Sequence, residues 1–99
     1  MIFKYRLHDA WVRKVSNMEE FANGGTQVTV KLKDGKLILG VLISSCTYII
    51  AARGHKDLPF KLDDIDDIFQ SEEDKNPRER GGWFYWDNWK RRNDDERET

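Results

Sequence analysis

The chain has 99 residues and a net charge of −1, which suits one small domain and excludes the strongly basic balance typical of nucleic-acid-binding domains. Its single cysteine, Cys46, excludes an intramolecular disulfide and favours a reducing compartment. The apolar runs are too short for a signal peptide or a membrane span, so we expect a soluble, cytoplasmic protein without membrane contact.

The N-terminal quarter predicts a short strand over residues 2–8 and a helix over residues 10–22. Asp9 is expected to cap this helix, because its carboxylate can accept a hydrogen bond from an N–H of the first turn. Gly24 is expected to follow its end, since glycine tolerates the left-handed conformation of a helix C-terminus. One apolar stripe at helical spacing consists of Trp11, Val12, Val15, Met18 and Phe21.

A hairpin is predicted next. Val28, Val30 and Leu32 alternate with polar residues, which is typical of a half-buried strand. Asp34-Gly35 follows, and this dipeptide supplies the positive φ angles of a tight turn.

The returning strand is expected over residues 36–45. Gly40 lies at its centre and predicts a sharp bend, as the closure of a barrel requires. A third strand is expected over residues 47–52. Apolar residues alternate again over residues 58–62, which predicts a fourth strand, and Pro59 places that strand at an edge.

The β-region is expected to end in one helical turn and a short fifth strand that buries Ile65, Ile68 and Phe69. The predicted fold class is mainly β (α+β): an N-terminal helix, then a small, strongly bent five-stranded antiparallel barrel, then a C-terminal tail. The expected core consists of Val28, Val30, Leu32, Leu39, Val41, Ile43, Ile49, Leu62 and Ile68.

From Gln70 the composition becomes polar and glycine-containing, which predicts a flexible linker before an aromatic segment and a charged end. The chain is therefore divided into a strand and helix segment (1–25), a barrel (26–70), and a linker with an aromatic, charged tail (71–99).

The stretch VTVKLKDGKLILGVLISS resembles the first motif of Sm-like proteins. The shared features are the alternating apolar residues, Lys33-Asp34-Gly35 at the hairpin, and Gly40 in the bent strand. The resemblance implies an SH3-like barrel of five bent strands that is preceded by a helix.

Among Sm-like folds, the layout is most similar to that of the bacterial Rho-binding antiterminator family. Residues 30–35 match its "LTLKDG" hairpin, and Leu62, Ile65 and Ile68 match its apolar ending. This resemblance implies a small regulator that binds a protein and controls transcription by antitermination.

Charge is distributed unevenly along the chain. Residues 57–74 carry one Lys against eight Asp/Glu, whereas residues 26–56 carry five Lys/Arg against one Asp, so we expect an acidic side and a basic side. The densest cluster, named here the acidic hook, consists of Asp63, Asp64, Asp66 and Asp67. Two interpretations remain open for it: a solvated turn that protects an edge strand, and a docking face for a basic protein partner. Its spacing is not that of an EF-hand, and no metal is expected.

RNA binding is the alternative function. In an Sm-like module, Lys31, Lys33, Lys36 and Arg53 would contact phosphates, and Tyr48 would stack on a base. The other interpretation of these residues is an ordinary solvent-exposed face.

The aromatic segment contains Trp83, Trp86 and Trp89. Large aromatic residues rarely stay exposed in a tail, so this segment is expected either to fold back over the domain or to bind a partner.

No catalytic motif is present, and the expected protein is not an enzyme and has no cofactor. Cys46, His8 and His55 are too few and too scattered to indicate a zinc site. The sequence therefore favours a non-enzymatic module that binds a basic protein partner. The alternatives are an RNA-binding module and an immunity-type or phage-type inhibitor protein, and homo-oligomerisation stays open.

Overall fold

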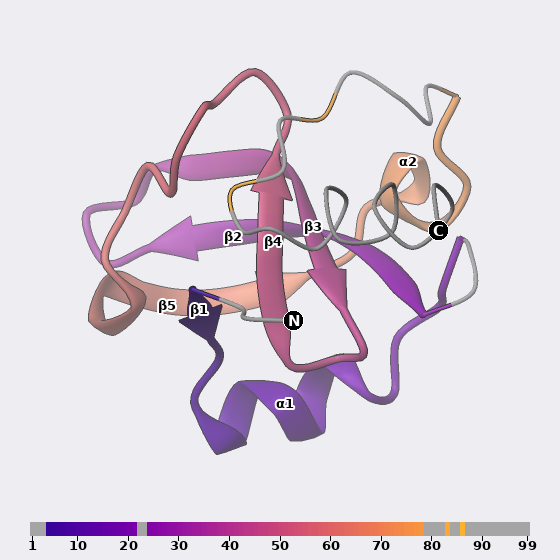
Figure 1. Ribbon diagram of the computed structural model, residues 1–99, viewed down its shortest axis with the longest axis horizontal. Coiled ribbons are helices and arrows are strands. Elements are labelled where there is room, and N and C mark those ends of the chain that lie inside the picture. The colour runs from indigo at the N-terminus through magenta and orange to yellow at the C-terminus, as the bar shows by residue number, and fades with distance from the viewer. Residues whose placement is uncertain (1–3, 22–23, 79–82, 84–85, 87–99) are drawn as a thin grey trace, which may run out of the picture.

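The computed structural model describes residues 4–21, 24–78, 83 and 86. These residues form one curled antiparallel sheet of five strands with two short helices (Figure 1). The elements in chain order are β1 (Tyr5–Arg6), α1 (Asp9–Val15), β2 (Gly25–Leu32), β3 (Leu37–Ser44), β4 (Tyr48–Ala52), the 3-10 turn η1 (Leu62–Asp64), β5 (Ile65–Phe69) and α2 (Glu72–Lys75). In the described part of the chain, no helix has the length and apolar character needed to span a bilayer.

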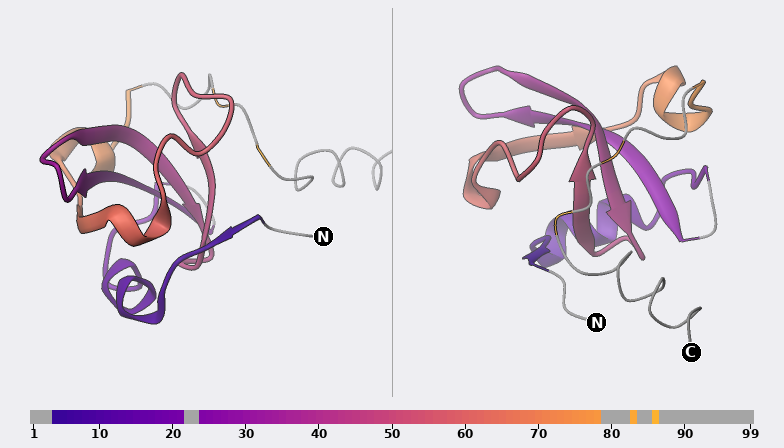
Figure 2. Two further views of the ribbon diagram at one scale, coloured as in Figure 1. Left: turned by 90° about the vertical axis from the view of Figure 1, so that its left-hand side faces the viewer. Right: turned by 45° about the horizontal axis from the view of Figure 1, so that its top comes forward.

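The sheet has the order β1-β4-β3-β2-β5, so β1 and β5 are its two edges. No pairing joins these edges within the described ranges, and the sheet is a half-barrel with an open seam. Figure 2 shows the sheet curling while the chain between β4 and η1 crosses its open side. The predicted fourth strand over residues 58–62 is wrong, because these residues form bends and the start of η1. Pro59 offers no N–H there, so it cannot donate to a strand ladder.

The β2–β3 hairpin closes at the predicted turn. Leu32 N–H donates to the Lys36 carbonyl at 2.9 Å, and Gly35 N–H donates to the Leu32 carbonyl at 2.9 Å. Gly35 has a φ of +93°, whereas Asp34 keeps a negative φ and instead accepts a hydrogen bond from Lys36 N–H through its carboxylate at 3.0 Å. The hairpin is therefore a three-residue loop with a glycine bulge rather than a two-residue turn.

Gly40 marks the bend in β3, as predicted. Val28 pairs with Val41 and Val30 pairs with Ile38, so two β3 residues lie opposite one β2 residue. This bulge places Gly40 at a φ of +63° and turns Leu39 outward. Leu39 is 65% exposed, and its predicted place in the core is wrong.

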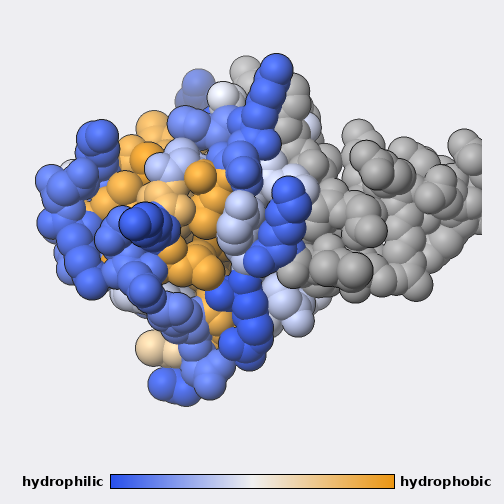
Figure 3. Space-filling model, turned by 60° about the vertical axis from the view of Figure 1, so that its left-hand side comes forward, coloured by the Kyte–Doolittle hydropathy of each residue, from blue (hydrophilic) through white to orange (hydrophobic). Residues whose placement is uncertain are grey.

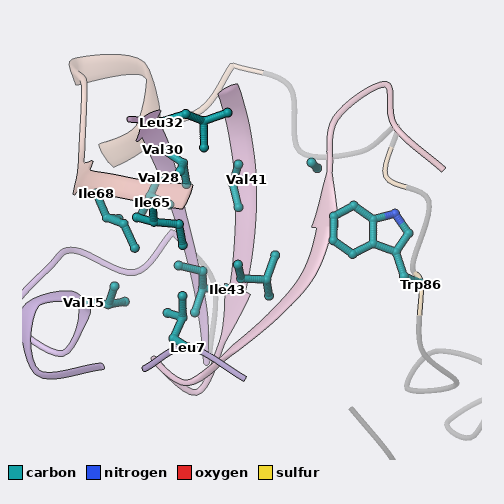
Figure 4. Close-up of a cluster of buried hydrophobic side chains, with 12 residues drawn as sticks. Leu7, Val15, Val28, Val30, Leu32, Val41, Ile43, Ile65, Ile68 and Trp86 are labelled. Atoms are coloured by element: carbon teal, nitrogen blue, oxygen red, sulfur yellow. The ribbon is translucent and has the colours of Figure 1, made fainter. Parts of the chain in front are cut away.

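The core fills the hollow of the curled sheet, and the remaining predicted core residues lie in it except Leu62, which is partly buried against it. In Figure 4, Val15 of α1 enters the core from one side and Trp86 from the other. The buried residues of this cluster are Leu7, Val15, Val28, Val30, Leu32, Val41, Ile43, Ile49, Ala52, Ile65, Ile68 and Trp86.

The N-terminal helix is shorter than predicted. It ends at Val15, its N-cap residue is His8, and Asp9 lies inside the first turn. The hydroxyl of Ser16 and the amide of Asn17 both donate to the Arg13 carbonyl, at 2.7 and 3.1 Å. Such side-chain bonds compete with the helix and explain why it ends. The rest of the predicted helix continues without helical structure as far as residue 21.

The polar stretch after β5 begins with a helix, not a flexible linker. Ser71 and Asp74 form a capping box for α2: each side chain accepts a hydrogen bond from the other residue's backbone N–H. The division of the chain into three segments stays a prediction.

Candidate functional site

A groove follows the open seam of the half-barrel. It has a volume of about 410 Å³ and lies between β1 and the stretch that leads into η1. We name it the seam groove, and its lining residues are Tyr5, His8, Leu58, Phe60, Lys61, Leu62 and Asp63.

The floor of the seam groove is apolar. Leu58, Phe60 and Leu62 are partly buried and pack against the main core. They keep part of their surface in solvent because no strand pairs across the seam to cover them. Figure 3, which brings this side of the molecule forward, shows apolar residues gathered in the middle of the face and polar residues around them.

One hydrogen bond anchors the loop that forms the groove. Tyr5 donates its hydroxyl to Asp57 Oδ1 at 2.7 Å, and the same oxygen accepts Leu58 N–H at 2.8 Å. The bond to Asp57 raises the pKa of Tyr5, and the bond from Tyr5 lowers the pKa of Asp57. The loop is thereby tied to β1 at the point where its apolar residues begin.

The structure divides the acidic hook into two halves. Asp67 binds Lys14 of α1 at 2.5 Å, and Asp66 lies 3.8 Å from Lys31 of β2. The hydrogen bond from Lys14 is the main reason that the pKa of Asp67 lies below its ordinary value. Both carboxylates therefore have a lysine partner, while the Asp67 and Asp66 side chains stay 42% and 52% exposed, and their role in binding a partner stays a prediction.

The other half points into solvent. The Asp63 side chain is 87% exposed and lies 3.5 Å from His8 Nε2, while Asp64 is exposed and makes no side-chain ion pair with a described residue. Both belong to η1, whose backbone is fixed because Lys33 N–H of the hairpin donates to the Asp64 carbonyl at 2.9 Å. The result is two carboxylates on a rigid turn at the end of the apolar groove.

The residues expected for RNA binding are not brought together. Lys33 and Lys36 lie at the β2–β3 hairpin, and Lys31 is near Asp66. Tyr48 pairs with Ser44 at the opposite end of β3. Arg53 lies with its guanidinium 4.2 Å from the centre of the Trp83 ring. The expected stacking residue is thus separated from the lysines by the length of a strand.

Part of the aromatic segment folds back on the domain. Trp86 is 7% exposed, donates its Nε1–H to the His55 carbonyl at 3.1 Å, and meets the Tyr5 ring edge-on at 5.7 Å. Trp83 is half-buried beside Arg53, and Trp89 lies outside the described residues. A partner-binding role of these three tryptophans stays a prediction, and the burial of Trp86 gives that residue a structural role.

The sequence analysis also considered Cys46, His8 and His55 as possible metal ligands. Cys46 is half-buried, and burial raises the pKa of its thiol. Within the described ranges, His, Cys, Asp and Glu side chains form no group of three that would hold a metal ion.

Comparisons with protein-family models, with curated proteins and with solved structures find no significant match to this chain.

Sequence reasoning missed the seam groove and the docking of α2. Leu58 and Phe60 were expected in a strand. They line a groove because no strand pairs with this stretch of the chain. The pattern Ser71-x-x-Asp74 did carry a readable signal, because Ser followed three residues later by an acidic residue is a capping pattern.

Proposed function

We propose that this chain is a small, non-enzymatic binding module that docks a basic segment of a protein partner in the seam groove. The observation that carries the proposal is the position of Asp63 and Asp64, which stand on a fixed turn at the end of an apolar groove. The Sm-like layout and a regulatory role like that of the Rho-binding antiterminator family belong to the same proposal, and they rest on the sequence resemblance.

The composition of the groove supports a protein as the partner. Stable protein interfaces combine an apolar centre with a polar rim, and aromatic anchors contribute much of the binding energy. Leu58, Phe60 and Leu62 supply the apolar centre, while Lys61 and Asp63 belong to the rim. A partner segment with one or two bulky apolar side chains would fill it.

The charge of the site supports a basic partner. Free carboxylates at the rim attract Lys and Arg side chains and repel acidic segments. Among the described residues, Asp64 makes no side-chain ion pair and Asp63 lies near His8, whereas Asp66 and Asp67 each have a lysine partner. The attraction of Asp63 and Asp64 acts on the rate of association, since exposed charges steer a partner more than they hold it.

Site-directed photo-crosslinking in the source cells tests this proposal. A photo-reactive lysine derivative at Lys61 should crosslink to a protein, which mass spectrometry identifies, because this side chain borders the groove. The same derivative at Arg13, an exposed position on α1, is the matched control.

The crosslink from position 61 should weaken strongly when Asp63→Asn and Asp64→Asn are combined, and much less when Asp66→Asn and Asp67→Asn are combined. Crosslinks that are equally strong from both positions, or that lead to RNA rather than protein, would refute the proposal.

A further inference from the structure

Trp86 contacts two segments that lead into the seam groove. Its side chain is 7% exposed, and its backbone N–H donates to the Ile50 carbonyl of β4 at 3.2 Å, so the residue is anchored on the sheet. From there the indole meets the Tyr5 ring of β1 edge-on at 5.7 Å and donates its Nε1–H to the His55 carbonyl at 3.1 Å. Figure 4 shows this indole beside β4, on the opposite side of the core from Val15.

Both contacts of Trp86 continue to the lining of the groove. Tyr5 is itself a lining residue, and its hydroxyl donates to Asp57 Oδ1 at 2.7 Å. The same oxygen accepts the N–H of Leu58, an apolar residue of the groove floor, at 2.8 Å. His55 comes shortly before Asp57 in the chain. Trp86 therefore holds this loop directly at His55 and, through Tyr5, at Asp57.

The loop over residues 55–58 relies on such contacts for its position. The side chains of His55, Lys56 and Asp57 are exposed, so burial contributes little to holding them. An edge-to-face ring contact and an indole hydrogen bond are both directional. The two contacts of Trp86 therefore fix where the loop and the Tyr5 ring lie, in addition to the stability that the buried indole contributes.

We propose that Trp86 is a positioning residue of the seam groove, and that the docking of this C-terminal residue regulates how tightly the groove binds its partner. The inference rests on the function proposed for the groove. Trp86 does not line the groove, so it acts through Tyr5 and the loop that carries Leu58. When Trp86 leaves its site, the loop loses its bond at His55 and Tyr5 loses the ring that orients it. Partner binding then weakens, because a groove that is not preformed must be ordered on binding.

The pKa of Tyr5 tests the positioning role without any partner. The hydrogen bond to Asp57 raises this pKa, so a Tyr5 ring that Trp86 no longer orients should titrate closer to its ordinary value. NMR titration of the full-length chain follows the ring signals of Tyr5. Trp86→Leu should lower the Tyr5 pKa, whereas Val15→Ala, which removes core volume on the opposite side, should leave it at the wild-type value. A general loss of stability does not produce this difference, because both substitutions remove buried apolar groups.

Trp86→Phe is a second variant, and it keeps a ring in the core but has no donor for the His55 carbonyl. It should raise the hydrogen-exchange rate of the Leu58 amide about threefold or more, since the loop that carries this amide loses a support. This measurement decides the question should Trp86→Leu fail to fold. An unchanged Tyr5 pKa in folded Trp86→Leu, or an unchanged Leu58 exchange rate in Trp86→Phe, would overturn the proposal.

Photo-crosslinking from position 61 in the source cells tests the consequence for binding. At equal amounts of the chain, Trp86→Leu should weaken the crosslink about threefold or more, and Val15→Ala should weaken it less. A wild-type crosslink that Trp86→Leu leaves unchanged would overturn this inference alone. A wild-type chain that gives no crosslink would overturn the proposed function together with it.

Discussion

At the scale of single residues, Gly40 does more than permit a bend. Its φ of +63° lies in the left-handed region, and a Cβ at this position would lie 3.1 Å from the Cβ of Arg53. Glycine therefore serves two purposes: it allows the bulge in β3, and it leaves room for the side chain of Arg53.

Gly40→Ala should lower the free energy of unfolding by about 2–3 kcal/mol, because left-handed strain and a close contact add together. Gly35→Ala is the matched control, since Gly35 also has a positive φ but would place its Cβ in open space. The control should lose only about 1–2 kcal/mol, the cost of the strain. Urea unfolding of both variants measures the difference, and equal losses would contradict the role of the Arg53 contact.

Asp74 is the residue that turns a polar stretch into a docked helix. Three donors converge on its carboxylate, and an asparagine offers only one acceptor oxygen and sets an N–H₂ group against them. Asp74→Asn should therefore cost about 1–3 kcal/mol, the range for leaving buried hydrogen-bonding groups unsatisfied.

The matched control for Asp74 is Glu73→Gln, which changes an exposed carboxylate on the same helix and should stay within about 0.5 kcal/mol. Thermal unfolding compares the two variants. The interpretation fails if they melt at the same temperature.

At the scale of elements, the β3–β4 connection is unusual in its composition. Ser45 and Cys46 have φ angles of 52° and 61°, and Thr47 N–H donates to the Ser44 carbonyl at 3.0 Å. A turn with two left-handed residues normally contains Asn and Gly. This turn therefore carries strain that better-suited residues would remove.

Ser45→Asn should stabilise the protein by about 0.5–1 kcal/mol, because asparagine tolerates the left-handed region and Ser45 is exposed. Ser45→Val should act in the opposite direction, since a β-branched side chain is disfavoured there. Denaturant midpoints of the two variants measure the effect. Identical midpoints would mean that the turn is not strained.

An ion pair between Lys14 and Asp67 adds to the apolar packing of α1 near β5. The hydrogen bond from Lys14 lowers the pKa of Asp67 below its ordinary value of 3.8. A carboxyl group whose folded-state pKa is depressed stabilises the fold above its unfolded pKa, and this contribution is lost as the pH falls through the folded value. The loss is therefore expected below about pH 4.

Asp67→Asn should be slightly less stable than the wild type at pH 7, and the difference should shrink between pH 4 and pH 2. Both partners are nearly half exposed, so the effect should not exceed about 0.5–1 kcal/mol. Asparagine keeps an oxygen for Ile68 N–H, so the variant isolates the charge. A stability difference that does not change with pH would exclude this role of the pair.

The sequence predicts an element well when the residues that determine the element lie close together in the chain. The hairpin at Gly35, the bend at Gly40 and the turn before β5 follow from short-range chemistry, and the structure confirms them. The predicted helix length was wrong because Ser16 and Asn17 end the helix through side-chain bonds. The predicted strand over residues 58–62 was wrong because Pro59 has no N–H to donate to a strand ladder, and these residues form bends instead.

The candidate site was less predictable than the fold. The acidic hook was visible as a charge cluster, but its division depends on Lys14 and Lys31, which reach it from other elements. The seam groove depends on the unpaired seam, which has no local sequence signal because it results from how distant strands pair. The exposure of Leu39, in contrast, follows from the bulge at Gly40.

At the scale of the whole molecule, the curled sheet presents two different surfaces. The seam groove on its open side has an apolar floor with Lys61 and Asp63 beside it, and the hollow next to Gly40 on the other face is lined by two guanidinium and two carboxylate side chains. Charges of both signs thus border both hollows, and the acidic and basic sides expected from the sequence stay a prediction.

The central claim is that Asp63 and Asp64 steer a basic protein into the seam groove. Once crosslinking has identified the partner, its association rate with the full-length chain is measured over a range of salt concentrations. The chains compared are the wild type, the Asp63→Asn/Asp64→Asn variant and the Asp66→Asn/Asp67→Asn variant.

At low salt, where screening is weak, the first variant should associate more slowly than the wild type, and this difference should fade as salt is added. The second variant removes the same number of charges, but from residues that do not line the groove, so it should slow association less than the first. Equal rates for the wild type and the Asp63→Asn/Asp64→Asn variant at low salt would contradict the claim, and the acidic hook would then be only a solvated turn.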